Sequence, residues 1–402
     1  MAYLPPHKRH SKGSGGPSPV PASLPRQFKR GLNFRSPKTN ANQSGKIVYA
    51  NTAISRWFAV GLGDDGDHLP SGVFLKPVSV EAVERRSGEK PLALAKSCMA
   101  NEDAETGRDH SKKPWVHIAE TVMPDLVSSF EVVRSEIQGQ SMEEIKPTLV
   151  ARFGKIHFHG SPSFPFPVET CGDMVTETSL KQLKRSFYTN VPASFVKNVT
   201  LRIIPEIDLS FEDEKDIYHV KLSDKSRPDS TISCKCSVSK AEQRLELYKV
   251  ELNQVRHMVV DVSCLDKDLD MRLMLYTKRI LTAISEKEKN SIRDLIASAV
   301  IDSSVKGGLR WPLGKESSGD RYSVVGVWHT ISKTYKNSSM RLKVRHADRF
   351  DFRISHGEVT EETVLKLKGI TSELHGQSLQ TDLISDVLKD AVKMMWEHFL
   401  SC

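Results

Sequence analysis

The chain has 402 residues, of which 38% are hydrophobic and 27% charged, and its formal net charge is +8 at pH 7. These values are typical of a globular protein with one large or two medium domains, and they exclude a chain that is disordered throughout. Six cysteines without a repeated spacing exclude a disulfide scaffold, and no apolar run approaches the ~18 residues that a membrane helix needs. We therefore expect no membrane segment and a location in the cytoplasm or nucleus.

The first 45 residues hold the whole net charge. They contain eight Lys or Arg and no Asp or Glu, so residues 46–402 are formally neutral. The Pro, Gly and Ser content of this segment predicts a disordered arm that cannot bury enough apolar surface to fold. We expect its basic side chains to attract RNA or another polyanion through salt-dependent contacts with phosphate. These side chains are Lys8, Arg9, Lys12, Arg26, Lys29, Arg30, Arg35 and Lys38.

Three further features of the arm concern partners and targeting. Leu24, Phe28 and Leu32 recur every four residues among basic ones, which predicts an apolar stripe that docks on a partner protein or on the chain's own domain. Ser18 and Ser36 each precede a proline, which suggests a docking segment controlled by phosphorylation. An acid-free N-terminus also fits an organellar transit peptide, although the prolines oppose the amphipathic helix of a mitochondrial presequence.

Ordered structure is expected from residue 46 onward. Residues 47–60 and 73–83 are rich in β-branched and aromatic side chains and predict a hairpin around a loop rich in Gly and Asp. Gly61, Gly63 and Gly66 in that loop match the spacing of a dinucleotide fingerprint. The aspartates around them and the absence of a following helix argue against such a site.

A polar run over residues 99–113 has no apolar periodicity and is the best internal linker. If residues 46–402 comprise two parts, the boundary falls here and gives 46–98 and 114–402. A helix follows, with Pro124 in its first turn. After it we expect a strand over 147–161 and a short basic helix over 179–187.

The longest β tract follows, with turn signals about every ten residues, which is typical of consecutive antiparallel strands. Its predicted strands are 199–211, 217–222, 231–238, 244–252, 258–265 and 271–281. Apolar spacing then predicts a helix over 285–301. The last elements are strands 322–335 and 340–354 around a turn at 336–339, and helices 360–367 and 379–400.

The element order predicts an α+β fold. We expect a large, mainly antiparallel β-sheet, curled or split in two, packed with helices and closed by a long C-terminal helix. The basic arm precedes this region.

Two pairs of candidate metal ligands stand on strands. His157 and His159 share one strand face, and so do Cys234 and Cys236. Together they suit zinc, but neither pair has the spacing that makes such sites specific. We predict no metal and no cofactor. No nucleophile, phosphate-loop or paired-carboxylate pattern is present either, which favours a binding role over catalysis.

Positive evidence for binding lies in the strand that begins at residue 340. Arg341, Lys343 and Arg345 share one face of it, and a row of cations on a sheet can hold phosphates. The simpler alternative is a solvated face of balanced ion pairs, since antiparallel sheets commonly turn one polar face to water. In the loop before these strands, Trp311 is expected to cover the core rather than to stack on a base.

Two resemblances are carried by the N-terminus. Residues 1–10, M-A-Y-L-P-P-H-K-R-H, resemble the start of an uncharacterised plant protein family that opens with M-A-Y-[IL]-P-P-H-K-R-H and continues with a segment like residues 28–34. This family has no assigned function, so it implies no site residue. Residues 3–9 are also similar to the Y-[IV]-P-P-H-L-R segment of DEAD-box RNA helicases, with Lys8 in place of its Leu. That similarity implies an association with RNA-handling proteins.

The sequence therefore predicts an RNA-associated binding or adaptor protein whose basic arm attracts phosphate. An enzyme or enzyme relic with an unrecognised site in the sheet is one alternative. A phosphorylation-regulated interaction scaffold is the other.

Overall fold

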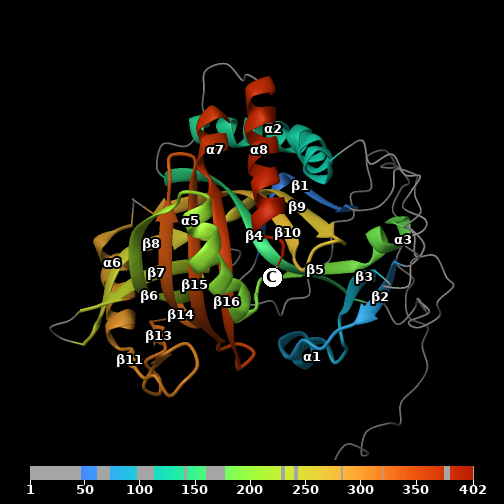
Figure 1. The fold of residues 1–402 in the computed structure, drawn as a ribbon. Helices are drawn as coiled ribbons and strands as arrows, with labels where there is room; N and C mark the ends of the chain where they lie inside the picture. Colours follow the sequence, from blue (N-terminus) through green and yellow to red (C-terminus); the bar gives the residue numbers. More distant parts are fainter. Residues whose placement is uncertain are drawn as a thin grey trace, which may run out of the picture. The chain divides into compact units, whose positions relative to one another are not determined.

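The computed structural model describes residues 47–60, 73–96, 113–139, 143–159, 177–227, 231–239, 243–281, 284–319, 321–374 and 381–401. All of them belong to one compact unit, Asn42–Cys402. The predicted fold class is confirmed: these residues form an α+β structure with a 14-stranded, mainly antiparallel sheet and a long C-terminal helix (Figure 1). The eight basic residues of the arm, its apolar stripe, its two Ser-Pro sites and the Gly61–Gly66 loop lie outside the described residues.

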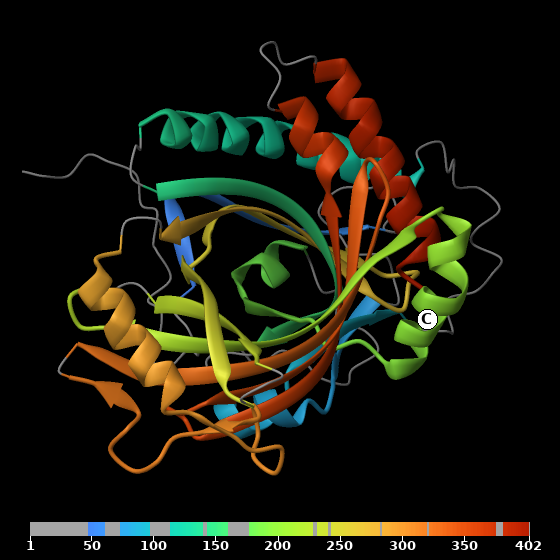
Figure 2. The ribbon, with the colours of Figure 1, turned by 90° about the vertical axis from the view of Figure 1, so that its left-hand side faces the viewer.

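The central strands of the sheet close into a ring. Each neighbouring pair is antiparallel, and the ring closes because β10 pairs with β4 as well as with β8. Figure 2 shows the strands curving round until they meet, with α2 (Pro114–Gly139), α6 (Glu286–Ala297) and α8 (Thr381–His398) on the outside. In ring order the strands are β4 (Glu143–His159), β10 (Asp270–Leu281), β8 (Leu245–Leu252), β7 (Thr231–Val238), β6 (Ser210–Asp224), β14 (Tyr322–Lys336), β15 (Met340–Asp351) and β16 (His356–Leu367).

The contacts between neighbouring ring strands, which we call seams, differ in the number of residues they pair. β4 and β10 pair continuously from Asp270↔Gly154 to Leu281↔Glu143. By contrast, β16 meets β4 over only three residue pairs, and β8 meets β10 at the single pair Ile280↔Glu251. Closure therefore depends on two short contacts.

Further strands extend the sheet beyond the ring. β1 (Val48–Val60) runs parallel to β9 (Val255–Cys264), which pairs with β10. The predicted hairpin of 47–60 with 73–83 is wrong, because the partner of β1 is distant in sequence and residues 81–87 are helical. Strand periodicity identifies a strand but not its neighbour. The other short strands are β2 (Val73–Pro77), β3 (Leu92–Lys96), β5 (Lys184–Tyr188), β13 (Ser317–Ser318) and the separate pair β11 (Val300–Ile301) with β12 (Leu309–Arg310).

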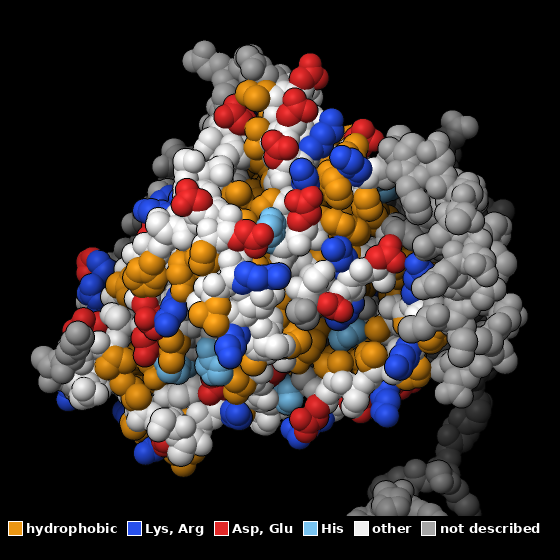
Figure 3. Space-filling view, in the orientation of Figure 1, with side chains coloured by type: hydrophobic (Ala, Val, Ile, Leu, Met, Phe, Trp, Pro, Cys, Tyr) orange, Lys and Arg blue, Asp and Glu red, His pale blue; other side chains and the backbone are white. Residues whose placement is uncertain are grey.

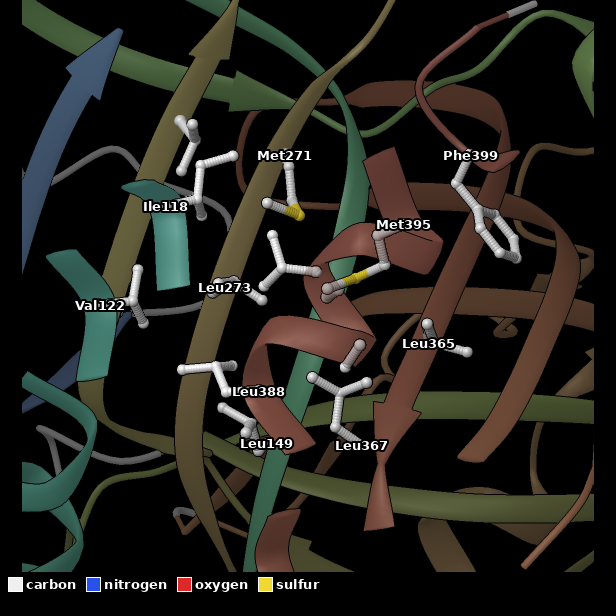
Figure 4. Close-up of a cluster of buried hydrophobic side chains, with 14 of the residues drawn as sticks. Ile118, Val122, Leu149, Met271, Leu273, Leu365, Leu367, Leu388, Met395 and Phe399 are labelled. Atoms are coloured by element: carbon white, nitrogen blue, oxygen red, sulfur yellow. The ribbon is translucent and has the colours of Figure 1, made fainter. Parts of the chain in front are cut away.

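The main hydrophobic core lies outside the ring, between its strands and the covering helices. Ile118 and Val122 of α2, Leu388 and Met395 of α8, and Leu273 of β10 meet there (Figure 4). Each fully buried large apolar side chain contributes about 1.5–3 kcal/mol. The helices are α1 (Glu81–Ser87), α2 (Pro114–Gly139), α3 (Glu177–Gln182), α4 (Ala193–Asn198), α5 (Ile204–Glu206), α6 (Glu286–Ala297), α7 (Lys368–Leu374) and α8 (Thr381–His398).

A second core covers another side of the ring. Ile292, Leu295 and Ile296 of α6 pack against the outward side chains of β6, β7 and β14. The helix begins with a capping box in which Ser285 and Glu288 satisfy each other's backbone N–H groups. This confirms the helix predicted after residue 285, although it ends at Ala297 rather than at residue 301.

Several predicted elements need correction. Pro124 lies inside α2, whose first residue is Pro114; the buried apolar face of this helix compensates for the hydrogen bond that the inner proline removes. The segment predicted as a strand over 199–211 is largely helical, because a π-helical segment Val199–Ile203 and α5 continue the helix α4 that precedes it. The buried residues Phe195, Val199 and Ile203 of this continuous helical stretch recur every four positions, which is a helical spacing.

Two further errors affect the ring itself. The helix predicted over 360–367 is strand β16, which is paired on both sides by β15 and β4. Residues 212–215, which separate two of the predicted strands, lie within β6. The basic helix predicted over 179–187 is a short helix, α3, followed by β5. In each case pairing with neighbouring strands overrides a local sequence preference.

Candidate functional site in the ring interior

The two faces of the ring strands differ in chemistry. Leu149, Met271 and Leu365 point outward into the main core. Because successive side chains of a strand point to opposite faces, the residues that alternate with them point into the ring. The outer wall is therefore mainly apolar, whereas the inner wall combines polar and charged side chains with a small apolar cluster of Val150, Met274, Tyr276 and Val364.

The inner wall carries mostly positive charge. Register with the outward core residues assigns acidic residues to the interior, namely Asp213, Glu246, Glu251, Asp270, Asp351, Glu358 and Glu362. The basic residues on this face outnumber them and come from all eight ring strands. They are Lys146, Arg152, Lys215, Lys221, Lys235, Lys249, Arg272, Lys278, Lys336, Arg341, Lys343, Arg345, Arg349 and Lys366.

Part of this charge is neutralised in what we call the paired clusters. In the first cluster, Glu362 is 1% exposed, contacts Arg349, and forms an ion pair with Arg345 at 2.7 Å between Oε2 and Nε. In the second, Glu251 lies between Lys235 and Lys249, with both Nζ atoms 2.9 Å from its carboxylate oxygens. Each carboxylate therefore neutralises part of the charge of two cations.

The carboxylates of both clusters stay ionised. Burial opposes the ionisation of Glu362, but Arg345, Arg349 and Arg152 outweigh it and hold the pKa of Glu362 well below its ordinary value. Burial likewise opposes the ionisation of Glu251, and the ammonium of Lys235 leads the groups that lower its pKa to about 2. The clusters are thus fixed structural ion pairs at neutral pH.

Four interior lysines have no such partner, and we call them the open lysines. Within the part of the chain that the structure describes, Lys221, Lys278, Lys343 and Lys366 make no ion pair with a carboxylate. All four are half-buried. Lys221 instead lies 4.6 Å from the ring centroid of Trp328.

The open lysines interact unfavourably with their surroundings. Burial, followed by the repulsion of Arg345, lowers the pKa of Lys343 to about 8. Burial and then the nearby Lys278 lower the pKa of Lys366 to about 8. Burial and Arg345 also lower the pKa of Arg152 to about 10, although Glu362 acts in the opposite direction. The fold thus concentrates positive charge around Lys343 and Lys366 without placing a carboxylate beside either of them.

Comparison with known proteins gives the family of the chain. Residues 41–399 match the model of a family described as Domain of unknown function (DUF7903). The chain belongs to this family. The match covers every described residue except 400 and 401, so the closed ring and its charged interior belong to the DUF7903 domain. No curated protein sequence shows significant similarity to the chain.

Some solved structures show a low similarity to this DUF7903 member. The Pct1 RNA triphosphatase of S. pombe aligns with a TM-score of 0.41 and 11% identity over 70% of this chain and 90% of that chain. The PH1012 protein of Pyrococcus horikoshii OT3 gives 0.24 and 10% over 52% and 87%, and a conserved hypothetical protein of Pyrococcus furiosus gives 0.23 and 10% over the same shares. Similarities at this level support no conclusion about activity.

The strand residues named from the sequence share one face, as predicted, and that face is the ring interior. Lys343 is an open lysine, Arg345 belongs to the Glu362 cluster, and Arg341 pairs with Glu212 at 2.5 Å. Lys221, Lys278, Lys366 and Arg152 were missed. Lys221, Lys366 and Arg152 alternate with apolar residues on their own strands, whereas Lys278 lies between Thr277 and Arg279. Only closure of the ring shows that these side chains face a common space.

The two pairs of candidate metal ligands do not meet. His157 stacks on Tyr188 with ring centroids 5.8 Å apart, and burial lowers its pKa to about 4. Cys234 and Cys236 are buried in the second core, under α6. In the described ranges no three His, Cys, Asp or Glu residues cluster as a metal site would require.

Other described features fit ordinary structural roles. The indole Nε1 of Trp311 donates to the Leu295 carbonyl oxygen at 2.9 Å, so this residue covers the second core, as predicted. On the face shown in Figure 3, Lys and Arg lie interspersed with Asp and Glu. Among the helices that the structure describes, none combines the length and apolar character needed to cross a membrane.

Proposed function

We propose that the ring interior binds a multiply charged anion made of linked phosphate groups. The observation that carries this proposal is the set of open lysines, which come from β6, β10, β15 and β16 and form no ion pair with a carboxylate among the described residues. Bringing like charges together in a half-buried space costs free energy. A bound anion with several charges offsets that cost.

The positions of the open lysines favour one ligand over several independent ions. Lys278 on β10 is close enough to repel both Lys343 on β15 and Lys366 on β16. An anion between these strands therefore reaches all three ammonium groups. Lysine acts as a compact point charge with three donors, which suits phosphate oxygens in several orientations.

The same geometry favours binding over catalysis. Glu251 and Glu362 are each held between two cations, which leaves neither of them as a general base or a metal ligand. Among described residues the interior offers cations and hydroxyls that can hold an anion, but no cluster of three His, Cys, Asp or Glu residues that could hold a metal ion.

Isothermal titration of the full chain with tripolyphosphate tests the proposal. The double variant Lys343→Met with Lys366→Met removes two charge-assisted contacts, each worth about 1.5–3 kcal/mol, so we expect affinity to fall by at least about tenfold. Lys333→Met is the matched control, because Lys333 lies on the outward face of β14 and is 54% exposed. Equal affinity of the double variant and the wild type, or no binding by a folded wild type, contradicts the proposal.

RNA is the phosphate-bearing polymer that the N-terminal arm suggests, and we propose that the arm adds salt-dependent attraction to it. The support is the charge of residues 1–45, which hold the whole net charge of the chain. Removing these residues should weaken RNA binding and flatten its dependence on salt concentration, while tripolyphosphate binding stays unchanged. Equal RNA affinity with and without the arm overturns its role. The predicted docking stripe and the phosphorylation sites remain predictions.

A further inference from the structure

We infer that the open lysines take up protons when the ring interior binds its anion, so that binding and protonation are coupled. The inference rests on the proposed function. Its own basis is geometric: several half-buried ammonium groups face one another across the ring without carboxylate partners. Such groups are easiest to protonate when an anion lies between them.

Lys343 is surrounded by cations on several strands. The charged groups that act on it are Arg345 of its own strand, Lys215 of β6, Lys235 of β7 and Lys278 of β10. Lys215 and Lys235 have carboxylate partners of their own, Asp213 and Glu251. Burial is the main cause that lowers the pKa of Lys343 to about 8, and the strongest charged neighbours among the described residues are all cations that lower it further.

Lys366 has an equivalent environment on the neighbouring strand. It is repelled by Lys278 of β10, Arg341 of β15, Lys235 of β7 and Lys368 just beyond its own strand. Burial is the larger cause and repulsion the smaller, and together they lower the pKa of Lys366 to about 8. Lys343 and Lys366 therefore release protons in the same pH range.

Lys221 and Lys278 complete the set from the other side of the ring. Burial is the main reason that the pKa of Lys221 falls to about 8; among its neighbours Glu251 raises it, and Lys235 and Lys278 lower it. Burial also lowers the pKa of Lys278. Glu251 opposes this effect, and Lys249, Arg345 and Arg152 lower the pKa further. His219 lies on the same strand as Lys221. Burial, followed by the repulsion of Lys221, Lys235, Arg345 and Lys343, holds its pKa well below the ordinary value.

A bound anion changes which protonation state of these lysines is favoured. Its negative charge stabilises the ammonium form, so their pKa values return toward the ordinary value of about 10.4. At about pH 8.5, a group whose pKa moves from about 8 to above 10 gains most of one proton. Lys221, Lys343 and Lys366 together then gain about two protons for each anion bound.

The experiment compares lysine with arginine at the same positions. Tripolyphosphate is titrated into the full-length wild type and the triple variant Lys221→Arg, Lys343→Arg and Lys366→Arg at about pH 8.5, in buffers of different ionisation enthalpy. Arginine keeps the charge but does not titrate in this range. Because the ligand's own protons contribute equally to both proteins, the difference between the two proton numbers belongs to the lysines.

We expect the wild type to take up about two more protons than the arginine variant. Lys333→Arg, on the outward face, should keep the wild-type proton number. If both proteins bind tripolyphosphate with equal proton numbers, the coupling is overturned and the proposed function stands. If neither protein binds it, the proposed function fails and the coupling fails with it.

A second measurement covers the case in which the arginine variant folds poorly. Inositol hexasulfate carries no titrating group between about pH 7 and 10, so any pH dependence of its binding to the wild type comes from the protein. We expect the affinity to fall by about tenfold or more from pH 7.5 to 9.5. Constant affinity over this range overturns the coupling.

Discussion

The paired clusters and the open lysines share one interior, yet they differ in how their charge is balanced. Glu362 and Glu251 each lie between two cations, whereas Lys343 and Lys366 lie among further cations. The fold places carboxylates beside some of its basic residues and not beside others. Charge that is balanced inside the ring stabilises the native state, and charge that is left unbalanced is available to a ligand.

The largest effect is expected from breaking the first paired cluster. Glu362→Ala leaves Arg345 and Arg349 without their buried partner, and stranding buried charge in this way typically costs about 3–5 kcal/mol. Urea denaturation should show this loss in the free energy of unfolding. Glu361→Ala is the neighbouring control, since Glu361 pairs outside the ring with the exposed His346 and should cost less than about 1 kcal/mol. Similar losses in the two variants would refute the distinction between ion pairs inside the ring and ion pairs outside it.

The second cluster should contribute less, and its contribution should depend on pH. Glu251→Gln removes the charge between Lys235 and Lys249 and should cost about 1–3 kcal/mol at neutral pH. The pKa of Glu251 falls from 4.5 to about 2 in the folded chain, so its stabilisation is present above pH 4.5 and is lost as the pH falls toward 2. The unfolding free energy of Glu251→Gln should therefore fall less steeply than that of the wild type across this window. If the unfolding free energies of the two proteins change in parallel with pH, the ion pairs of Glu251 with Lys235 and Lys249 do not stabilise the fold as predicted.

The open lysines should behave in the opposite way. Lys343→Met removes an unbalanced half-buried charge and should raise the free energy of unfolding by about 1 kcal/mol at neutral pH, while it weakens anion binding. Because the folded pKa of about 8 lies below the ordinary 10.5, the unfolded chain binds more protons between these values. Wild-type stability should thus rise from pH 8 toward 10, and this rise should be smaller in Lys343→Met. A destabilised variant would show that Lys343 is structural.

The smallest effect belongs to the outer wall. Lys333→Met alters an exposed ion pair with Glu214 at 4.0 Å, so the free energy of unfolding should change by less than about 0.5 kcal/mol. Chemical denaturation measures this change. A cost similar to that of Glu251→Gln would mean that position inside or outside the ring does not decide how much a charge contributes.

Much of the fold is predictable from local patterns. Alternation identifies most ring strands, and the turn at 336–339 is correct because the Asn337 carboxamide accepts the backbone N–H groups of Ser339 and Met340. The partners of the strands are not predictable in this way. Closure depends on a few residue pairs between strands far apart in sequence, and no local pattern encodes them.

The candidate site was only half predictable for the same reason. Alternation places Arg341, Lys343 and Arg345 on one face, but it does not say whether that face meets water or a ring interior. The error over residues 360–367 had a further effect. Read as a helix, this segment hides the register that sets Glu362 opposite Arg345, so the difference between the paired and the open cations could not be seen.

The single-pair seam between β8 and β10 has a kinetic consequence. Ile280 and Glu251 are the only residues paired across it in the described register, so the backbone there has fewer hydrogen bonds to break than at any other ring contact. Local opening should begin at this seam, and amide hydrogens near it should exchange sooner than those of the long β4 and β10 ladder. The Glu251 carboxylate pairs with Lys235 of β7 and with Lys249 of its own strand β8, so these ion pairs join β8 to β7 and do not span the seam with β10.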